Sequence, residues 1–262
     1  MDFEYLKYYY LIFMMTVPRL LAACSVLTFF SKGLYSGIAV RNGVILALAF
    51  YIAPIVDQGF AHYEELSPVQ LGFLTCKEVM LGFIVGYAVN IPFWAMSGVG
   101  HLIDNQRGAT IMENINAMTS SPGSPLADFF TQTAATLFII TGGFLVFFKG
   151  ILISYTAWPI TSFWPKMNPA LADYVISQFQ WLMVIVIILG GPVIIALFLS
   201  ELGLALISRF APQLNVFILS MSVKSGVAIA FLCVYFAVAV DYFDNLILKL
   251  DEKIAYVFGL MQ

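Results

Sequence analysis

The chain has 262 residues, of which 61% are hydrophobic and only 10% are charged, and its mean hydropathy is +0.92. An ordinary soluble domain carries about 25% charged residues, so this composition argues against a soluble globular protein. The net charge is −3 and no run of like charges occurs, so neither a nucleic-acid surface nor a polybasic lipid-binding patch is indicated.

The apolar residues fall in stretches that are long enough to cross a bilayer, which takes roughly 20 helical residues. The first stretch lacks the cationic start of a secretory signal, so we expect it to be retained. Prolines and a glycine pair interrupt two of the stretches, at Pro92 and at Gly190-Gly191-Pro192, where we expect kinks or breaks. The stretches are residues 8–30, 43–56, 72–99, 129–154, 179–199 and 214–240.

The last residues, 241–262, alternate apolar and charged positions at helical spacing and predict an amphipathic terminal helix. This helix is either a solvated helix packed on the core or a surface that contacts a partner. Its apolar positions are Phe243, Leu246, Ile247, Leu250, Ile254, Val257 and Met261.

Several charged residues lie inside the apolar stretches, where each costs about 2.5 to 3.5 kcal/mol at a bilayer centre. We therefore expect Arg19, Lys77-Glu78 and Lys224 to face protein or water. Gly82 and Gly86 form a small-xxx-small pair that lets two helix backbones approach closely. Lys and Arg are balanced between the two sides of a six-span arrangement, so loop charge does not give its orientation.

Motifs of catalysis or metal binding are absent from the sequence. The cysteines Cys24, Cys76 and Cys233 lie more than fifty residues apart inside apolar stretches, which favours small core residues over a metal site. The histidines His62 and His101 have no H-E-x-x-H spacing. We therefore predict no catalytic residue, no metal site and no cofactor.

A long polar interruption occupies residues 100–128. Asp104 and Arg107 are three residues apart and can pair on one helical face, and the Ser, Pro and Gly cluster that follows indicates an irregular loop. A plain connector would not need the apolar residues that recur at near-helical spacing in this loop, so we favour a functional role for it. These apolar residues are Ile111, Met112, Ile115 and Met118.

A second polar segment contains the run Arg-Phe-Ala-Pro-Gln-Leu-Asn-Val-Phe at 209–217, followed by Lys224-Ser225-Gly226. This segment, together with Ile-Asp-Asn-Gln-Arg-Gly at 103–108 and Ser-Pro-Leu at 124–126, resembles the family of injectisome T proteins (SctT, SpaR) and flagellar FliR. Lys224-Ser225 fits the injectisome branch better. Ser222 stands where many members have proline, so no helix break is assumed there.

The resemblance implies a non-enzymatic export-gate component of a type III secretion system in the bacterial inner membrane, at the centre of the basal body. The implied fold is all-α and membrane-protein-like, with long kinked helical hairpins packed in a helical multi-subunit assembly. Residues 1–175 would be similar to an R subunit, and residues 176–262 would be similar to the hairpin of a small Q-type (FliQ-like) subunit. The implied partners are R-type and Q-type subunits, the U-type switch protein and secreted polypeptides.

Two groups of residues are assigned roles on this basis. The first is a channel plug at residues 109–121, whose apolar face is made by Ile111, Met112, Ile115 and Met118, because methionine seals irregular constrictions and still moves aside. Its anchors and hinges are Asp104, Gln106, Arg107, Gly108, Pro122 and Pro125. The second group, around Pro212, supports assembly by satisfying freed backbone groups. It comprises Glu201, Arg209, Pro212, Gln213, Asn215 and Lys224.

Two other classes of function remain open at this point. Broken helices with buried ionisable groups are also typical of small-molecule secondary transporters, although no inverted repeat is visible in this sequence. A membrane-embedded enzyme is the third class, but the sequence has no G-x-S-x-G elbow and no paired catalytic carboxylates.

Overall fold

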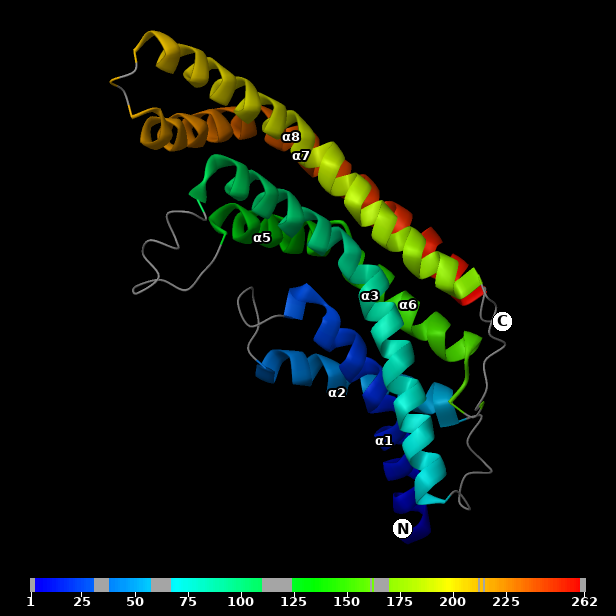
Figure 1. The fold of residues 1–262 in the computed structure, drawn as a ribbon. Coiled ribbons are helices and arrows are strands. Elements are labelled where there is room, and N and C mark those ends of the chain that lie inside the picture. The colour runs from blue at the N-terminus through cyan, green and yellow to red at the C-terminus, as the bar shows by residue number, and fades with distance from the viewer. Residues whose placement is uncertain are drawn as a thin grey trace. The chain divides into compact units, whose positions relative to one another are not determined.

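The computed structural model describes residues 3–30, 38–57, 67–109, 124–160, 162, 170–211, 213 and 215–259. Within these ranges the chain contains helices and no strand, which confirms the all-α prediction (Figure 1). The helices are α1 (Phe3–Val26), the short 3-10 helix η1 (Thr28–Phe30), α2 (Ile38–Asp57), α3 (Pro68–Arg107), α5 (Pro125–Ile140), α6 (Gly143–Ala157), α7 (Ala170–Phe210) and α8 (Val216–Gly259).

Four of these helices are long and apolar enough to cross a membrane. They are α1 over Tyr9–Val26, α3, α7 over Asp173–Phe210, and α8. Helices α5 and α6 pass the same test together, but they are bent by 73° at the short break between them. The chain is therefore a multi-pass membrane protein by the length and composition of its helices.

Kinks or breaks are expected at two prolines, and the structure shows that neither proline breaks its helix. Helix α3 continues through Pro92 and α7 continues through Pro192, because a proline removes one hydrogen bond and the rest of a long apolar helix is kept by its other bonds. The apolar stretch 129–154 is instead divided at Gly142, which has a φ of 77° and donates its N–H to the carbonyl of Ile139 at 3.2 Å. This left-handed conformation favours glycine and ends α5.

The terminal amphipathic segment is confirmed, but it is not a separate helix. It forms the last part of α8, a continuous helix of 44 residues, because no proline interrupts the chain between Gly226 and Gly259. The predicted apolar positions that the structure describes are all buried, namely Phe243, Leu246, Ile247, Leu250, Ile254 and Val257. Met261 lies outside the described residues.

The chain forms two compact units, each assembled from segments that are distant in sequence. The first unit comprises Met1–Ile91, Phe138–Gln178 and Ile247–Gln262, and the second comprises Pro92–Leu137 and Phe179–Leu246. The division into an R-like part, residues 1–175, and a Q-like part, residues 176–262, concerns resemblance rather than compactness and stays a prediction.

In the first unit, α1 packs closely against α3 through two glycines. A Cβ atom added at Gly82 would collide with the carbonyl oxygen of Arg19, and one added at Gly86 would lie 2.7 Å from the carbonyl oxygen of Ala23. The small-xxx-small prediction is thus confirmed for this helix pair. Cys24 is buried here as expected, but Cys76 and Cys233 are exposed, so the prediction of core cysteines is wrong for two of the three.

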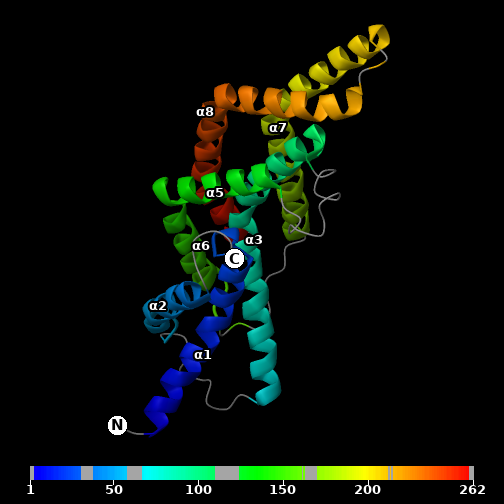
Figure 2. The same cartoon turned by 90° about the vertical axis from the view of Figure 1, so that its left-hand side faces the viewer.

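In the second unit, the later part of α3 packs against α5, and α7 and α8 form an antiparallel hairpin, as Figures 1 and 2 show. Gly100 on α3 lies so close to the backbone of Ala127 on α5 that a Cβ atom has no room. Aromatic side chains fill the contacts with α8, because Phe93 lies 6.5 Å from Phe243 and Phe129 lies 5.5 Å from Phe236 between ring centroids.

Candidate functional site

A buried carboxylate joins the two ends of the segment between α3 and α5. Asp104 lies in the last turn of α3 and is fully buried. Its Oδ1 accepts a hydrogen bond from Nε of Arg107 at 2.7 Å, which confirms the predicted pair. Its Oδ2 accepts hydrogen bonds from the hydroxyl of Ser124 and from the backbone N–H of Leu126 at 3.0 Å. One side chain therefore holds the residues on both sides of residues 110–123.

The Ser-Pro-Leu sequence at 124–126 has a direct structural explanation as the start of α5. The hydroxyl of Ser124 accepts the N–H of Ala127 at 3.2 Å, and its carbonyl accepts the N–H of Asp128 at 3.0 Å, so Ser124 is the N-cap. Pro125 occupies the first helical position, where a missing N–H carries no cost. Leu126 follows with its N–H directed to Asp104. The motif begins a helix and docks that beginning on α3.

On the other side of the segment, α3 ends at a glycine in the left-handed conformation. Gly108 has a φ of 82° and donates its N–H to the carbonyl of Asn105 at 3.1 Å. A side chain at this position would be strained. Gly108 therefore ends α3, and its role as a hinge stays a prediction.

The two polar motifs of the sequence meet at the same helix end. Nζ of Lys224 on α8 lies 2.8 Å from Oε2 of Glu201 on α7 and donates to the carbonyl oxygen of Gln106 at 3.4 Å. Lys224 is buried, at 8% exposed, whereas the side chain of Glu201 is about half exposed, at 52%. A cation next to the last carbonyls of a helix is stabilised by the negative end of the helix dipole. Lys224 thus connects the α7–α8 hairpin to the end of α3.

The other residues of the predicted assembly group are not gathered around Lys224. Arg209, Gln213 and Asn215 are exposed at and beside the turn that joins α7 to α8. They are separated from Lys224 because that residue lies more than two helical turns into α8. Pro212 lies outside the described residues.

The predicted plug face also lies outside the part of the chain that the structure describes. This applies to Ile111, Met112, Ile115, Met118 and the hinge residue Pro122. The described anchors, by contrast, are Asp104, Gln106, Arg107, Gly108 and Pro125. The structure therefore describes the base of the loop and leaves its apolar face a prediction.

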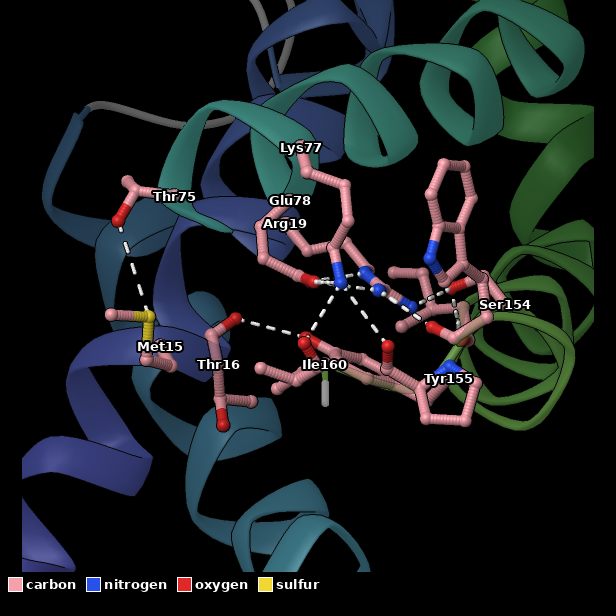
Figure 3. Close-up of polar contacts among 12 residues, drawn as sticks. Met15, Thr16, Arg19, Thr75, Lys77, Glu78, Ser154, Tyr155 and Ile160 are labelled. Carbon is pink, nitrogen blue, oxygen red and sulfur yellow. Dashed lines mark hydrogen bonds and ion pairs between the residues drawn. The ribbon is translucent and has the colours of Figure 1, made fainter. Parts of the chain in front are cut away.

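A second polar cluster, in the first unit, surrounds the fully buried Arg19 of α1 (Figure 3). Its Nε lies 2.6 Å from Oε2 of Glu78 on α3, and its Nη2 lies 3.0 Å from Oε1 of the same carboxylate. Its Nη1 donates to the hydroxyl of Ser154 at 3.1 Å, and its guanidinium carbon lies 4.0 Å from the ring centroid of Tyr155. This bidentate pair with a stacked aromatic ring joins α1, α3 and α6.

Lys77 adds a second cation to this cluster and is held by the chain that follows α6 (Figure 3). Its Nζ lies 3.0 Å from Oε1 of Glu78. It also donates to the backbone carbonyls of Pro159 at 3.1 Å, Ile160 at 2.9 Å and Ser162 at 3.0 Å. Backbone carbonyl oxygens carry partial negative charge and accept hydrogen bonds. The three carbonyls therefore stabilise the second cation of this cluster, which contains one carboxylate for two cations.

Sequence reasoning identified these charges as needing protein neighbours, and the structure confirms this for Arg19, Lys77, Glu78 and Lys224. It did not identify the partners, because Ser154 and the carbonyls after α6 have no sequence signature of their own. Among the described residues, no group of three or more His, Cys, Asp or Glu side chains is placed to hold a metal ion. The geometry is that of helix-joining polar clusters.

Comparison with known proteins identifies a family and relatives that align with most of the chain. The family described as "Bacterial export proteins, family 1" matches residues 10–250. The chain is 36% identical to the Yop proteins translocation protein T of Yersinia pestis over 252 residues, which are 96% of each chain. It is 34% identical to the surface presentation of antigens protein SpaR of Shigella flexneri, over 80% of this chain and 81% of that one.

A more distant relative is the flagellar biosynthetic protein FliR of Bacillus subtilis, at 29% identity over 74% of this chain and 75% of the relative. The resemblance to a secretion family that the two polar motifs indicated is therefore confirmed. Since the family model covers most of the chain and the Yersinia relative aligns over 96% of its own length, the chain belongs to the bacterial export proteins of family 1.

Proposed function

We propose that this chain is the T-type export-gate component of a type III secretion injectisome. The observation that carries the proposal is the alignment with the Yersinia translocation protein T over 96% of both chains. In this role the chain assembles with R-type and small Q-type subunits, and with the U-type switch protein, in the inner membrane at the centre of the basal body. Secreted polypeptides pass through the assembly, and the chain contributes structure rather than catalysis.

The lengths of the helices support a place inside a larger assembly. Helices α3, α7 and α8 have 40, 41 and 44 residues, which corresponds to about 60 Å or more at 1.5 Å per residue. A bilayer core is only about 30 Å thick, and a tilt of up to about 40° does not absorb the difference. A large part of each helix therefore needs an environment other than lipid, and neighbouring subunits provide one.

The uneven burial of the helices also supports a place inside a larger assembly. In the most apolar window of α3, 67% of the residues are buried within the chain, whereas the values for α7 and α8 are 28% and 17%. Helix α3 is thus a core helix, and the apolar faces of α7 and α8 remain to be covered. Contact with partner subunits over these faces is the arrangement that the proposed role requires.

The same proposal places the channel plug at residues 109–121. Its support is the base of the loop, where Asp104 holds Ser124 and Leu126 on one side and Arg107 on the other. A segment fastened at both ends can move aside for a polypeptide and return without losing its position. An apolar constriction also opposes ion flow by dewetting when no substrate is present.

Expression with and without partner subunits tests the role of the chain. The full-length chain is produced alone and together with the R-type and Q-type subunits of the same cell, and each preparation is analysed by size-exclusion chromatography. We expect aggregation alone and a discrete complex with partners, and we expect loss of type III secretion when the chain is deleted from the cell. Normal secretion without the chain would refute the proposal.

The plug has its own test. Deletion of residues 110–119 should leave the complex assembled, because the anchors at its base remain, and should let ions or small dyes leak across the envelope. An assembled complex with unchanged permeability would show that the loop is a connector.

The alternative function, a small-molecule secondary transporter, is not supported. The relatives are named as a translocation protein, a surface presentation of antigens protein and a flagellar biosynthetic protein.

A further inference from the structure

The first turns of α7 and the last turns of α8 form an open groove in the first unit, with a volume of ≈ 450 Å³. It does not include any of the polar residues assigned above to the loop base or to the Arg19 cluster. The residues that line it are Tyr174, Ser177, Gln178, Glu252, Lys253 and Tyr256.

One side chain of this groove has an unused hydrogen-bonding group. Tyr174 is only 6% exposed, and its buried hydroxyl has no hydrogen-bond partner. A buried hydroxyl without a partner is unfavourable, so a polar ligand in the groove would stabilise the protein by pairing with it. The neighbouring ring of Tyr256, 6.2 Å away between centroids, forms the outer aromatic wall.

The groove also presents two opposite charges side by side, the carboxylate of Glu252 and the ammonium of Lys253. Such a pair matches a ligand that carries both signs and disfavours one that carries a single charge. In the same turn of α7, outside the groove, Val175 is 42% exposed and Ile176 is 65% exposed. The surface around the groove is therefore apolar, which suits a ligand with a zwitterionic head and an apolar part.

The position of the groove along α7 restricts the class of possible ligands further. Its polar residues Ser177 and Gln178 lie just before the apolar run that begins at Trp181. Tyrosine and tryptophan at such a transition are typical of the headgroup level of a bilayer. A lipid is a ligand whose polar headgroup and apolar acyl chains meet at this same level of the bilayer.

We propose that this groove binds the headgroup of a zwitterionic phospholipid with a primary ammonium group, of the phosphatidylethanolamine type. The lipid phosphate accepts hydrogen bonds from the hydroxyl of Tyr174 and the ammonium of Lys253, and the lipid ammonium pairs with the carboxylate of Glu252. The acyl chains extend from the groove along the apolar surface of α7. The bound lipid holds the start of α7 against the end of α8, independently of the export role proposed above.

The test measures lipid retained by the full-length chain, purified in mild detergent with any subunits that accompany it. The preparation is incubated with mixed micelles that contain phosphatidylethanolamine or phosphatidylglycerol, and bound lipid per chain is counted by native mass spectrometry. We expect about five-fold more phosphatidylethanolamine than phosphatidylglycerol, the factor that about 1 kcal/mol for one charge gives. Glu252→Gln should abolish this preference, and Tyr174→Phe with Lys253→Met should remove retention of both lipids.

Lys249→Met serves as the matched control, because it removes an exposed cation of the same helix that does not line the groove. It should retain lipid as the unaltered chain does. Tyr174→Phe alone keeps the ring, so added phosphatidylethanolamine should raise the melting temperature of the unaltered chain more than that of this variant. Equal retention of the two lipids, or equal retention by the unaltered chain and the double variant, would overturn the proposal. A photo-crosslinker at Ser177 that captures a polypeptide and no lipid would overturn it as well.

Discussion

The hydroxyl of Ser124 donates a hydrogen bond to the carboxylate of Asp104, twenty residues earlier in the chain. This bond joins the N-cap residue of α5 to the last turn of α3. Because Arg107 holds the other oxygen of the same carboxylate at 2.7 Å, the position of the loop base depends on one buried acid. Both of these partners of Asp104 lie outside residues 110–123.

Replacement of Asp104 by asparagine should therefore destabilise the second unit. The amide lacks the negative charge that Arg107 pairs with and accepts hydrogen bonds at one oxygen only, and hydrogen bonds to a charged group contribute about 1.5 to 3 kcal/mol each. Thermal unfolding of the purified protein in detergent should show that the free energy of unfolding falls by about 1.5 to 3 kcal/mol. Asp128→Asn, an exposed acid in the first turn of α5, is the control and should lose about 1 kcal/mol or less. Equal losses in the two variants would contradict the anchoring role of Asp104.

The Arg19 cluster predicts a strong coupling between two substitutions. Glu78→Gln leaves the buried guanidinium of Arg19 without its carboxylate and should lower the free energy of unfolding by about 3 to 5 kcal/mol. Arg19→Met should cost less, because Glu78 keeps Lys77 as a partner at 3.0 Å. The double variant should lose less than the sum of the two, because each single variant already breaks the pair of Arg19 with Glu78. Lys149→Met removes one partner of an exposed pair, Lys149 to Asp251 at 2.6 Å, and should cost about 0 to 1 kcal/mol. Additive losses in the double variant would show that the pair does not act as a unit.

The contact between α1 and α3 makes a prediction about glycines on one helix. Gly86→Ala should reduce the yield of folded protein, because the new methyl group would lie 2.7 Å from the carbonyl oxygen of Ala23. Gly72→Ala on the same helix has no atom within 4 Å and should instead stabilise the helix by about 0.8 to 1 kcal/mol. Folded yield is measured by size-exclusion chromatography of the detergent extract. A harmless Gly86→Ala substitution would mean that α1 and α3 pack less closely than described.

Lys224 and Arg209 should respond differently to replacement by methionine. Lys224 is buried next to the last carbonyls of α3, so Lys224→Met should lower the stability of the chain itself by up to about 2 kcal/mol. Arg209 is exposed in the last turn of α7, so Arg209→Met should leave thermal unfolding unchanged. If Arg209 supports assembly, as its motif predicts, Arg209→Met should lower the amount of complex recovered with partner subunits. Unchanged recovery would remove Arg209 from the assembly group.

Short-range features could be predicted from the sequence because they depend on helical periodicity and local spacing. The helical class, the buried positions of the terminal segment such as Phe243 and Ile254, and the pair of Asp104 with Arg107 all follow from residues three, four or seven apart. The composition also showed that the charges at Arg19 and Lys224 need neighbours. The family motifs indicated a secretion function, although they left the chemistry of each residue open.

The tertiary structure decided which distant residues become those neighbours. Arg19 meets Glu78, 59 residues away, and Lys224 meets the carbonyl of Gln106, 118 residues away. No local period encodes such pairs, because they depend on which helix faces pack together and on backbone carbonyls that look alike in every residue. The division of one apolar stretch at Gly142, rather than at the prolines, was decided in the same way. A glycine shows that a left-handed turn is possible, and only the tertiary structure shows which glycine of the chain makes it.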